Sequence, residues 1–115
     1  GQLHGGIAQG AGQALLEHSE YDSEGQLLSG SFLDYAIPRA DDLPSFYTNM
    51  YTDAPCKTNP LGAKGVGEIG VVGSIPAIAN AVLDALWEQG VRHFDMPANP
   101  QKIWKLLQKK KTETN

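Results

Sequence analysis

The sequence has one cysteine, no excess of basic residues and no long apolar run. Cys56 therefore has no partner for an internal disulfide, and a lone cysteine is typical of the cytoplasm, where we expect the protein to be located. The three histidines lack metal-ligand spacing, so we expect no metal held directly by side chains. A net charge of −4 argues against a nucleic-acid partner. Without about 18 successive apolar residues, we expect no membrane span.

Glycine is abundant instead, with 13 residues in the chain. Apolar residues recur at helical spacing over residues 3–17, which predicts a helix. That helix contains Gly5, Gly6, Gly10 and Gly12, which together would cost roughly 4 kcal/mol relative to alanine in an exposed helix. We therefore expect another group to pack closely against its bare backbone.

A second glycine cluster surrounds one carboxylate, that of Glu68, in the sequence Lys64-Gly65-Val66-Gly67-Glu68. A carboxylate held on such a loop, away from water, can accept a proton near neutral pH. The alternative is an ordinary exposed loop carboxylate. The glycines also match the G-x-G-x-x-G string of nucleotide-binding folds, but no apolar strand precedes them, so a nucleotide-binding module is disfavoured.

Two further helices are predicted from apolar spacing and capping signals. One covers residues 74–89 and would be capped by its first residue, a serine. The other opens at Asn99-Pro100, a cap followed by proline at the first helical position. We expect its lysine-rich end, residues 109–115, to be a frayed tail.

Strands are predicted in three places. Residues 18–22 and 26–29 flank turn-forming residues and suit a hairpin, residues 45–52 have strand composition, and residues 91–94 suit a short strand. The predicted fold class is therefore α+β: a glycine-rich helix, a small antiparallel sheet, a long loop carrying Glu68, and two C-terminal helices.

Both glycine clusters resemble motifs of one enzyme family. Residues 1–12 resemble the segment G-Q-x-x-G-G-x-x-Q-G-x-G in the molybdenum-binding large subunit of the xanthine dehydrogenase, aldehyde oxidase and aerobic carbon monoxide dehydrogenase family. Residues 60–68 resemble that family's K-G-x-G-E active-site loop. The resemblance covers nearly the whole chain. It implies that residues 1–115 form a C-terminal, incomplete portion of a molybdopterin-binding domain, within a longer polypeptide.

The resemblance also implies chemistry. The enzyme would use the molybdenum cofactor, molybdopterin, to oxidise an aldehyde, carbon monoxide or an N-heteroaromatic, with water as the oxygen source. Glu68 would be the catalytic base, and iron–sulfur clusters and FAD would lie on partner subunits or domains. The cofactor-binding residues that it implies are Gln2, Lys64, Gly65, Val66 and Gly67.

Two departures from the family pattern bear on specificity. Ile69-Gly70 follows the glutamate where xanthine dehydrogenases tend to have two prolines, which disfavours purines, and His4 replaces an acidic residue. We expect the isolated segment to be inactive. The alternative of a different class is a non-catalytic structural or interaction domain, in which Glu68 is idle.

Overall fold

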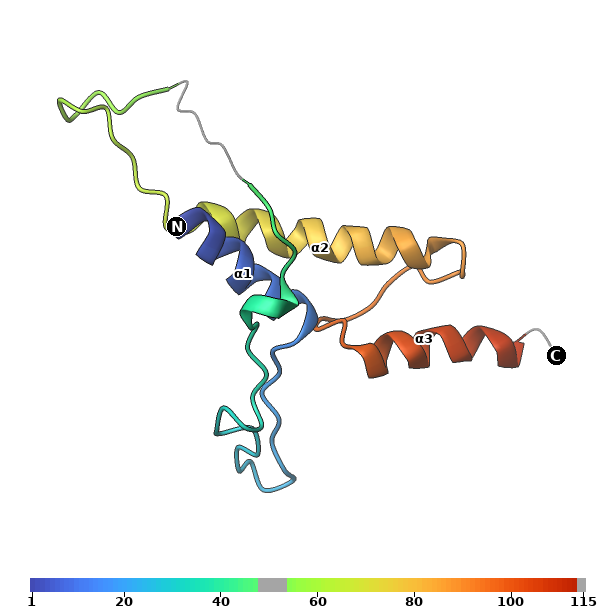
Figure 1. Ribbon diagram of the computed structural model, residues 1–115. Helices are drawn as coiled ribbons and strands as arrows, with labels where there is room; N and C mark the ends of the chain where they lie inside the picture. The colour runs from blue at the N-terminus through green and yellow to red at the C-terminus, as the bar shows by residue number, and fades with distance from the viewer. Residues whose placement is uncertain (48–53, 114–115) are drawn as a thin grey trace.

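The computed structural model describes residues 1–47 and 54–113 of the chain, with side chains to residue 108. Its elements are α1 (Gln2–Leu15), the short 3-10 helix η1 (Ala40–Asp42), α2 (Ile69–Trp87) and α3 (Pro100–Glu113). The molecule is elongated, with extents of 65 × 38 × 26 Å (Figure 1). Its radius of gyration is 18.5 Å, whereas a compact domain of this length has about 13 Å.

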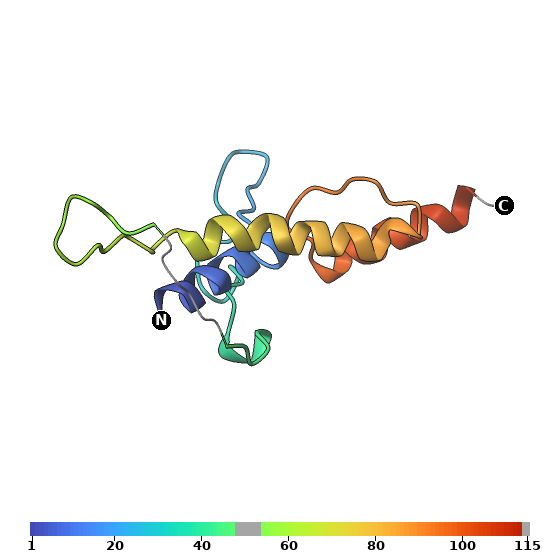
Figure 2. The same ribbon diagram turned by 90° about the horizontal axis from the view of Figure 1, so that it is seen from above.

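Helices α1 and α2 form the one closely packed pair of elements in the described part of the chain. They lie side by side in both views (Figures 1 and 2). Gly6 faces Gly70, and Gly10 faces Ser74, four residues further along each helix. The two helices therefore run in the same direction, and both begin at the same end of the pair.

The predicted close partner of the glycine-rich helix is thus, in part, another helix. A Cβ atom on Gly70 would lie 2.5 Å from the carbonyl oxygen of Leu3 and 2.9 Å from the Cα of Gly6. A Cβ on Gly10 would collide with the Ser74 side chain. Because the neighbours at Gly6 and Gly70 are main-chain atoms, a larger residue there requires the helices to move apart.

Helix α2 begins earlier than predicted. It starts at Ile69, with Glu68 as its N-cap residue, so the expected start at Ser74 is wrong. Ser74 is buried inside the helix, and its hydroxyl donates to the Val71 carbonyl at 3.3 Å. Its small side chain fits against Gly10, which explains a serine at this position without a capping role. Gly90, at φ +78°, follows the end of the helix as expected.

The predicted antiparallel sheet is not seen in the described residues, and the fold class is helical there rather than α+β. The hairpin at 18–29 reduces to a single bridge between Tyr21 and Leu27. Residues 91–94 form no strand, and of the expected strand 45–52, residues 45–47 are irregular while the rest lie outside the described residues. An isolated hairpin is marginal in water, and the described chain offers it no third strand.

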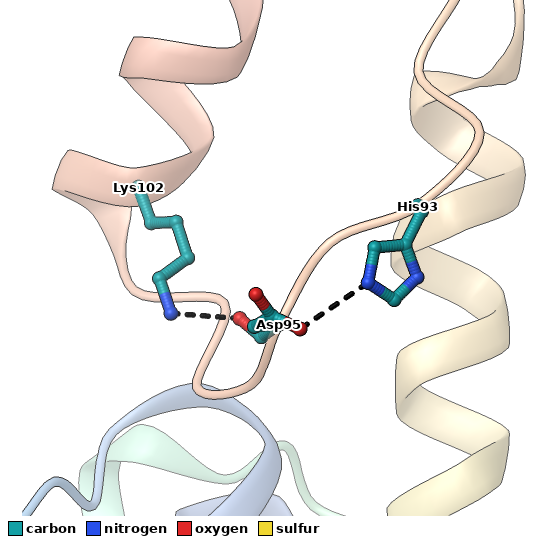
Figure 3. Close-up of polar contacts among 3 residues, drawn as sticks. All are labelled: His93, Asp95 and Lys102. Carbon is teal, nitrogen blue, oxygen red and sulfur yellow. Dashed lines mark hydrogen bonds and ion pairs between the residues drawn. The ribbon is translucent and has the colours of Figure 1, made fainter.

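The connection from α2 to α3 is held by several hydrogen bonds (Figure 3). The ammonium group of Lys102 donates to the main-chain oxygen of Asp95 at 2.7 Å, and the Asp95 carboxylate lies 3.2 Å from His93 Nε2. The main-chain nitrogen of Ala98 donates to the Ala14 oxygen at 2.7 Å. These bonds attach the connection to the end of α1 and to the start of α3.

Helix α3 begins where the sequence predicts. The side-chain oxygen of Asn99 accepts a hydrogen bond from the Lys102 N–H at 2.8 Å, and Pro100 is the first helical residue. This arrangement satisfies one of the N–H groups that a helix start leaves free.

The hydrophobic core is small. Among the described residues no large side chain is fully buried, and the buried apolar side chains are Ala11, Ala14, Leu86, Val91, Pro97 and Ala98. Large apolar side chains are exposed instead, including Phe32 at 84% and Leu33 at 97%. Surface of this kind typically contacts another part of a protein or a partner.

Helix α2 is apolar along most of its length. It has 19 residues, and an 18-residue window of it has a mean hydropathy of 1.7, which by length and composition alone would allow it to cross a membrane. The same composition occurs in core helices of soluble proteins, and α2 already packs one side on α1. The expectation that the chain has no membrane span therefore stays a prediction.

Candidate active site

Helices α1 and α2 begin at the same end of the helix pair, and the second glycine cluster leads into α2 there. Gln2 is the first residue of α1, and Glu68 is the N-cap residue of α2. The Leu3 carbonyl lies against Gly70, so the first turns of the two helices face each other. Residues more than 60 positions apart in the sequence are thus brought to one end of the helix pair by the glycine contacts.

The segment from Lys64 to Glu68 leads into α2 as an irregular, mostly exposed stretch. Its main-chain N–H groups donate no hydrogen bond to another described residue. A Cβ on Gly65 or Gly67 would meet nothing within 4 Å, in contrast to Gly6, Gly10 and Gly70. These two glycines are therefore not used for packing within the described chain, and their surroundings are open to another molecule.

The Glu68 side chain is exposed and forms no capping hydrogen bond. Its main-chain oxygen accepts the Val72 N–H at 3.0 Å, which fixes the residue's backbone to α2. The carboxylate is thus attached to a rigid helix start while its oxygens make no hydrogen bond within the described chain. Gln2, across the helix pair, is likewise exposed.

The electrostatics of this end favour negative charge. Two helices begin here, and each helix start carries a partial positive charge and free N–H groups. Lys64 is exposed on the adjoining segment. Such an arrangement suits a ligand that carries phosphate or other anionic oxygens.

One residue near this end was not anticipated from the sequence. The side-chain amide of Asn59 forms two hydrogen bonds, each of 2.9 Å, with the main chain of Ala63. Turn-forming residues at Asn59, Pro60 and Gly62 are the signal that could have revealed this closed loop.

Two other contacts involve the first turns of α1 and the loop that precedes Lys64. The His4 ring, on the first turns of α1, packs edge-on against Phe46 with a centroid separation of 4.8 Å. The thiol of Cys56 lies 3.0 Å from the Thr58 hydroxyl, and this hydrogen bond lowers the pKa of Cys56 below its ordinary value. No group of three or more potential metal ligands occurs among residues 1–47 and 54–113.

Comparison with known proteins gives the class of the chain. Residues 1–44 match the family model described as a molybdopterin cofactor-binding domain. The chain is 41% identical over 107 residues to the carbon monoxide dehydrogenase large chain of Hydrogenophaga pseudoflava, covering 93% of this chain and 13% of the relative. It is 40% identical over 103 residues to the nicotine 6-hydroxylase large subunit of Paenarthrobacter nicotinovorans, covering 90% and 12%.

Solved structures agree with this assignment. A crystal structure of Cu,Mo-CO dehydrogenase in its carbon monoxide reduced state matches with a TM-score of 0.85 at 36% identity, over 96% of this chain and 14% of that chain. Quinoline 2-oxidoreductase from Pseudomonas putida 86 matches with a TM-score of 0.84 at 37% identity, over 93% and 14%. The open, elongated shape is therefore shared with segments of much larger chains.

The chain belongs to the family of molybdopterin-binding large subunits that includes the carbon monoxide dehydrogenases, aldehyde oxidoreductases and xanthine dehydrogenase-like enzymes. The resemblance inferred from the two glycine motifs is confirmed. The chain spans about one eighth of the length of these relatives, 13% of the carbon monoxide dehydrogenase large chain.

Proposed function

We propose that this chain supplies one wall of the cofactor site of a molybdenum hydroxylase, with Glu68 as the base. One observation carries the proposal: Gly70 packs against the first turns of α1, so that Gln2 and Glu68 are both exposed at one end of the α1–α2 pair. The Lys64–Glu68 segment that leads to this end has main-chain N–H groups that donate no hydrogen bond to another described residue. These groups fit a large, oxygen-rich anionic cofactor, because they combine donors, positive helix ends and backbone without side chains.

In this proposal the cofactor contacts come from both segments. The Gln2 amide can both donate and accept hydrogen bonds at the start of α1. Gly65, Val66 and Gly67 offer main-chain N–H donors, and the absent side chains at the two glycines allow close approach. Lys64 adds a positive charge. When bound, the molybdenum cofactor supplies the two-electron redox chemistry, and the chain supplies its orientation.

Glu68 would then hold and move a proton. A carboxylate at the cofactor's edge can accept the proton of a water-derived hydroxyl and so make its oxygen a stronger nucleophile toward an electron-poor carbon. Relatives named for carbon monoxide, nicotine and aldehydes make carbon monoxide, an N-heteroaromatic and an aldehyde the substrates to test. Electrons would leave through iron–sulfur and FAD groups on partner subunits or domains, in a cytoplasmic enzyme.

The test compares Glu68→Gln with the wild type in the full-length protein, together with its partner subunits. We expect unchanged molybdenum content and a kcat for dye reduction lowered by about 10²-fold or more, the typical contribution of a general base. Asp84→Asn removes another exposed carboxylate of α2, remote from the helix start, and serves as the matched control. If Glu68→Gln turns over all three substrate classes as fast as the wild type does, Glu68 is not the base. That result would favour a non-catalytic interaction domain.

A further inference from the structure

The segment that leads to Glu68 is preceded by a loop that is closed on itself. The Asn59 side-chain amide donates to the Ala63 carbonyl, and its oxygen accepts the Ala63 N–H, both at 2.9 Å. The paired bonds join one side chain to the main chain of one residue through two contacts. This pairing fixes Ala63 in both position and orientation, which a single hydrogen bond would not do.

Main-chain hydrogen bonds complete the loop. The Cys56 N–H donates to the Gly62 oxygen at 3.0 Å, and the Gly62 N–H donates to the Asn59 oxygen at 3.2 Å. Gly62 has φ +64°, a conformation that favours glycine, and a Cβ there would lie 2.9 Å from the Pro55 side chain. The loop is therefore ordered by its own contacts, although it projects beyond the α1–α2 pair (Figure 1).

In the described part of the chain, hydrogen bonds hold the stretch between this loop and α2 at its two ends. Its first end is Ala63, which Asn59 holds. Its second end is the start of α2, where the Ile69 N–H donates to the Val66 oxygen at 3.3 Å. Between these points lies Gly65, where a Cβ would meet nothing within 4 Å, whereas Gly67 lies inside the turn that the Ile69–Val66 hydrogen bond closes. The path of the intervening backbone therefore depends on where Asn59 places Ala63.

We propose that Asn59 is a positioning residue, which sets the approach of the Lys64–Glu68 segment to the active site by fixing Ala63. The inference rests on the proposed function, because it takes Glu68 as the base and the preceding main chain as the cofactor contact. Asn59 itself would touch neither substrate nor cofactor. Its effect is transmitted through the loop backbone.

The test uses the full-length enzyme with its partner subunits. Asn59→Ala removes both hydrogen bonds to Ala63, while Asn59→Asp keeps the acceptor for the Ala63 N–H and loses the donor to the Ala63 oxygen. We expect kcat per bound molybdenum to fall in the order wild type, Asp, Ala, with a loss of about 10- to 100-fold for Ala, as small misplacements of catalytic groups can cause. Asn80→Ala, at an exposed asparagine of α2, is the control and should retain kcat.

Other results would overturn the inference. A purely structural role would lower activity only in proportion to the molybdenum lost, with normal turnover per bound molybdenum. If the Asn59→Ala protein does not accumulate, the Asn59→Asp protein alone decides the question. A turnover per bound molybdenum equal to that of the wild type in Asn59→Asp would reject the positioning role of Asn59. Glu68→Gln assayed in parallel separates the two proposals: its inactivity alongside fully active Asn59 variants rejects only the positioning role.

Discussion

Replacing Gly70 by alanine tests the helix contact on which the site geometry depends. The added Cβ would lie 2.5 Å from the Leu3 oxygen, whereas ordinary contact begins at 3.4 Å, so the atoms must separate by about 0.9 Å. Gly6 Cα and Ile7 N, both 2.9 Å from the same position, block alternative small shifts. No side chain can rotate to make room, because all three neighbours are main-chain atoms.

The size of the effect follows from two opposing terms. Overpacking of a close contact costs about 1–3 kcal/mol, and alanine gains about 1 kcal/mol over glycine in a helix interior. Gly70→Ala should therefore destabilise the α1–α2 contact by up to about 2 kcal/mol. Gly73, on the same helix, has nothing within 4 Å of its would-be Cβ, so Gly73→Ala should gain the helical term alone. The two variants should differ by about 1–3 kcal/mol.

Hydrogen exchange read by mass spectrometry on the full-length subunit measures this difference. A gap of about 1–3 kcal/mol corresponds to about 5- to 150-fold faster exchange of α1 and α2 amides in Gly70→Ala than in Gly73→Ala. Equal exchange in the two variants would refute the reasoning, because it would mean that the helices do not approach each other at Gly70.

Two more results are expected. Asn99→Ala removes the cap that accepts the Lys102 N–H at 2.8 Å, and should destabilise the first turn of α3 by about 1 kcal/mol, seen as faster exchange there but not in α1. Thr58→Val removes the hydrogen bond that chiefly lowers the pKa of Cys56, so the pKa should rise and alkylation of the Cys56 peptide should begin at higher pH, while Thr58→Ser retains the wild-type profile.

The helices of this fold could be predicted well from the sequence. Apolar spacing located α1, and the Asn99-Pro100 pair located the start of α3, because both signals are local. The start of α2 was missed because Ser74 looks like a cap, while its actual role is to fit against Gly10 of another helix. A contact between distant segments leaves no local signature.

The prediction of an antiparallel sheet was wrong for a related reason. The turn at Asp22 is real, since its carboxylate accepts the N–H groups of Glu24 and Gln26 at 2.9 Å, but only one bridge follows it. A strand needs a partner edge, and composition alone does not say whether one exists. Asn59 escaped notice because its importance lies in two hydrogen bonds to the main chain rather than in reactive chemistry.

Two groups of glycines in this chain have opposite surroundings, and the proposed site needs both. Gly6, Gly10 and Gly70 are in contact with another helix, whereas Gly65 and Gly67 have open space around them. The first group brings the two helix starts together, because no larger residue would allow main-chain contact. The second group leaves the N–H groups of the loop accessible. Since few large side chains are buried elsewhere in the described chain, the separation of Gln2 from Glu68 depends on this contact, in which main-chain atoms meet at Gly6 and Gly70.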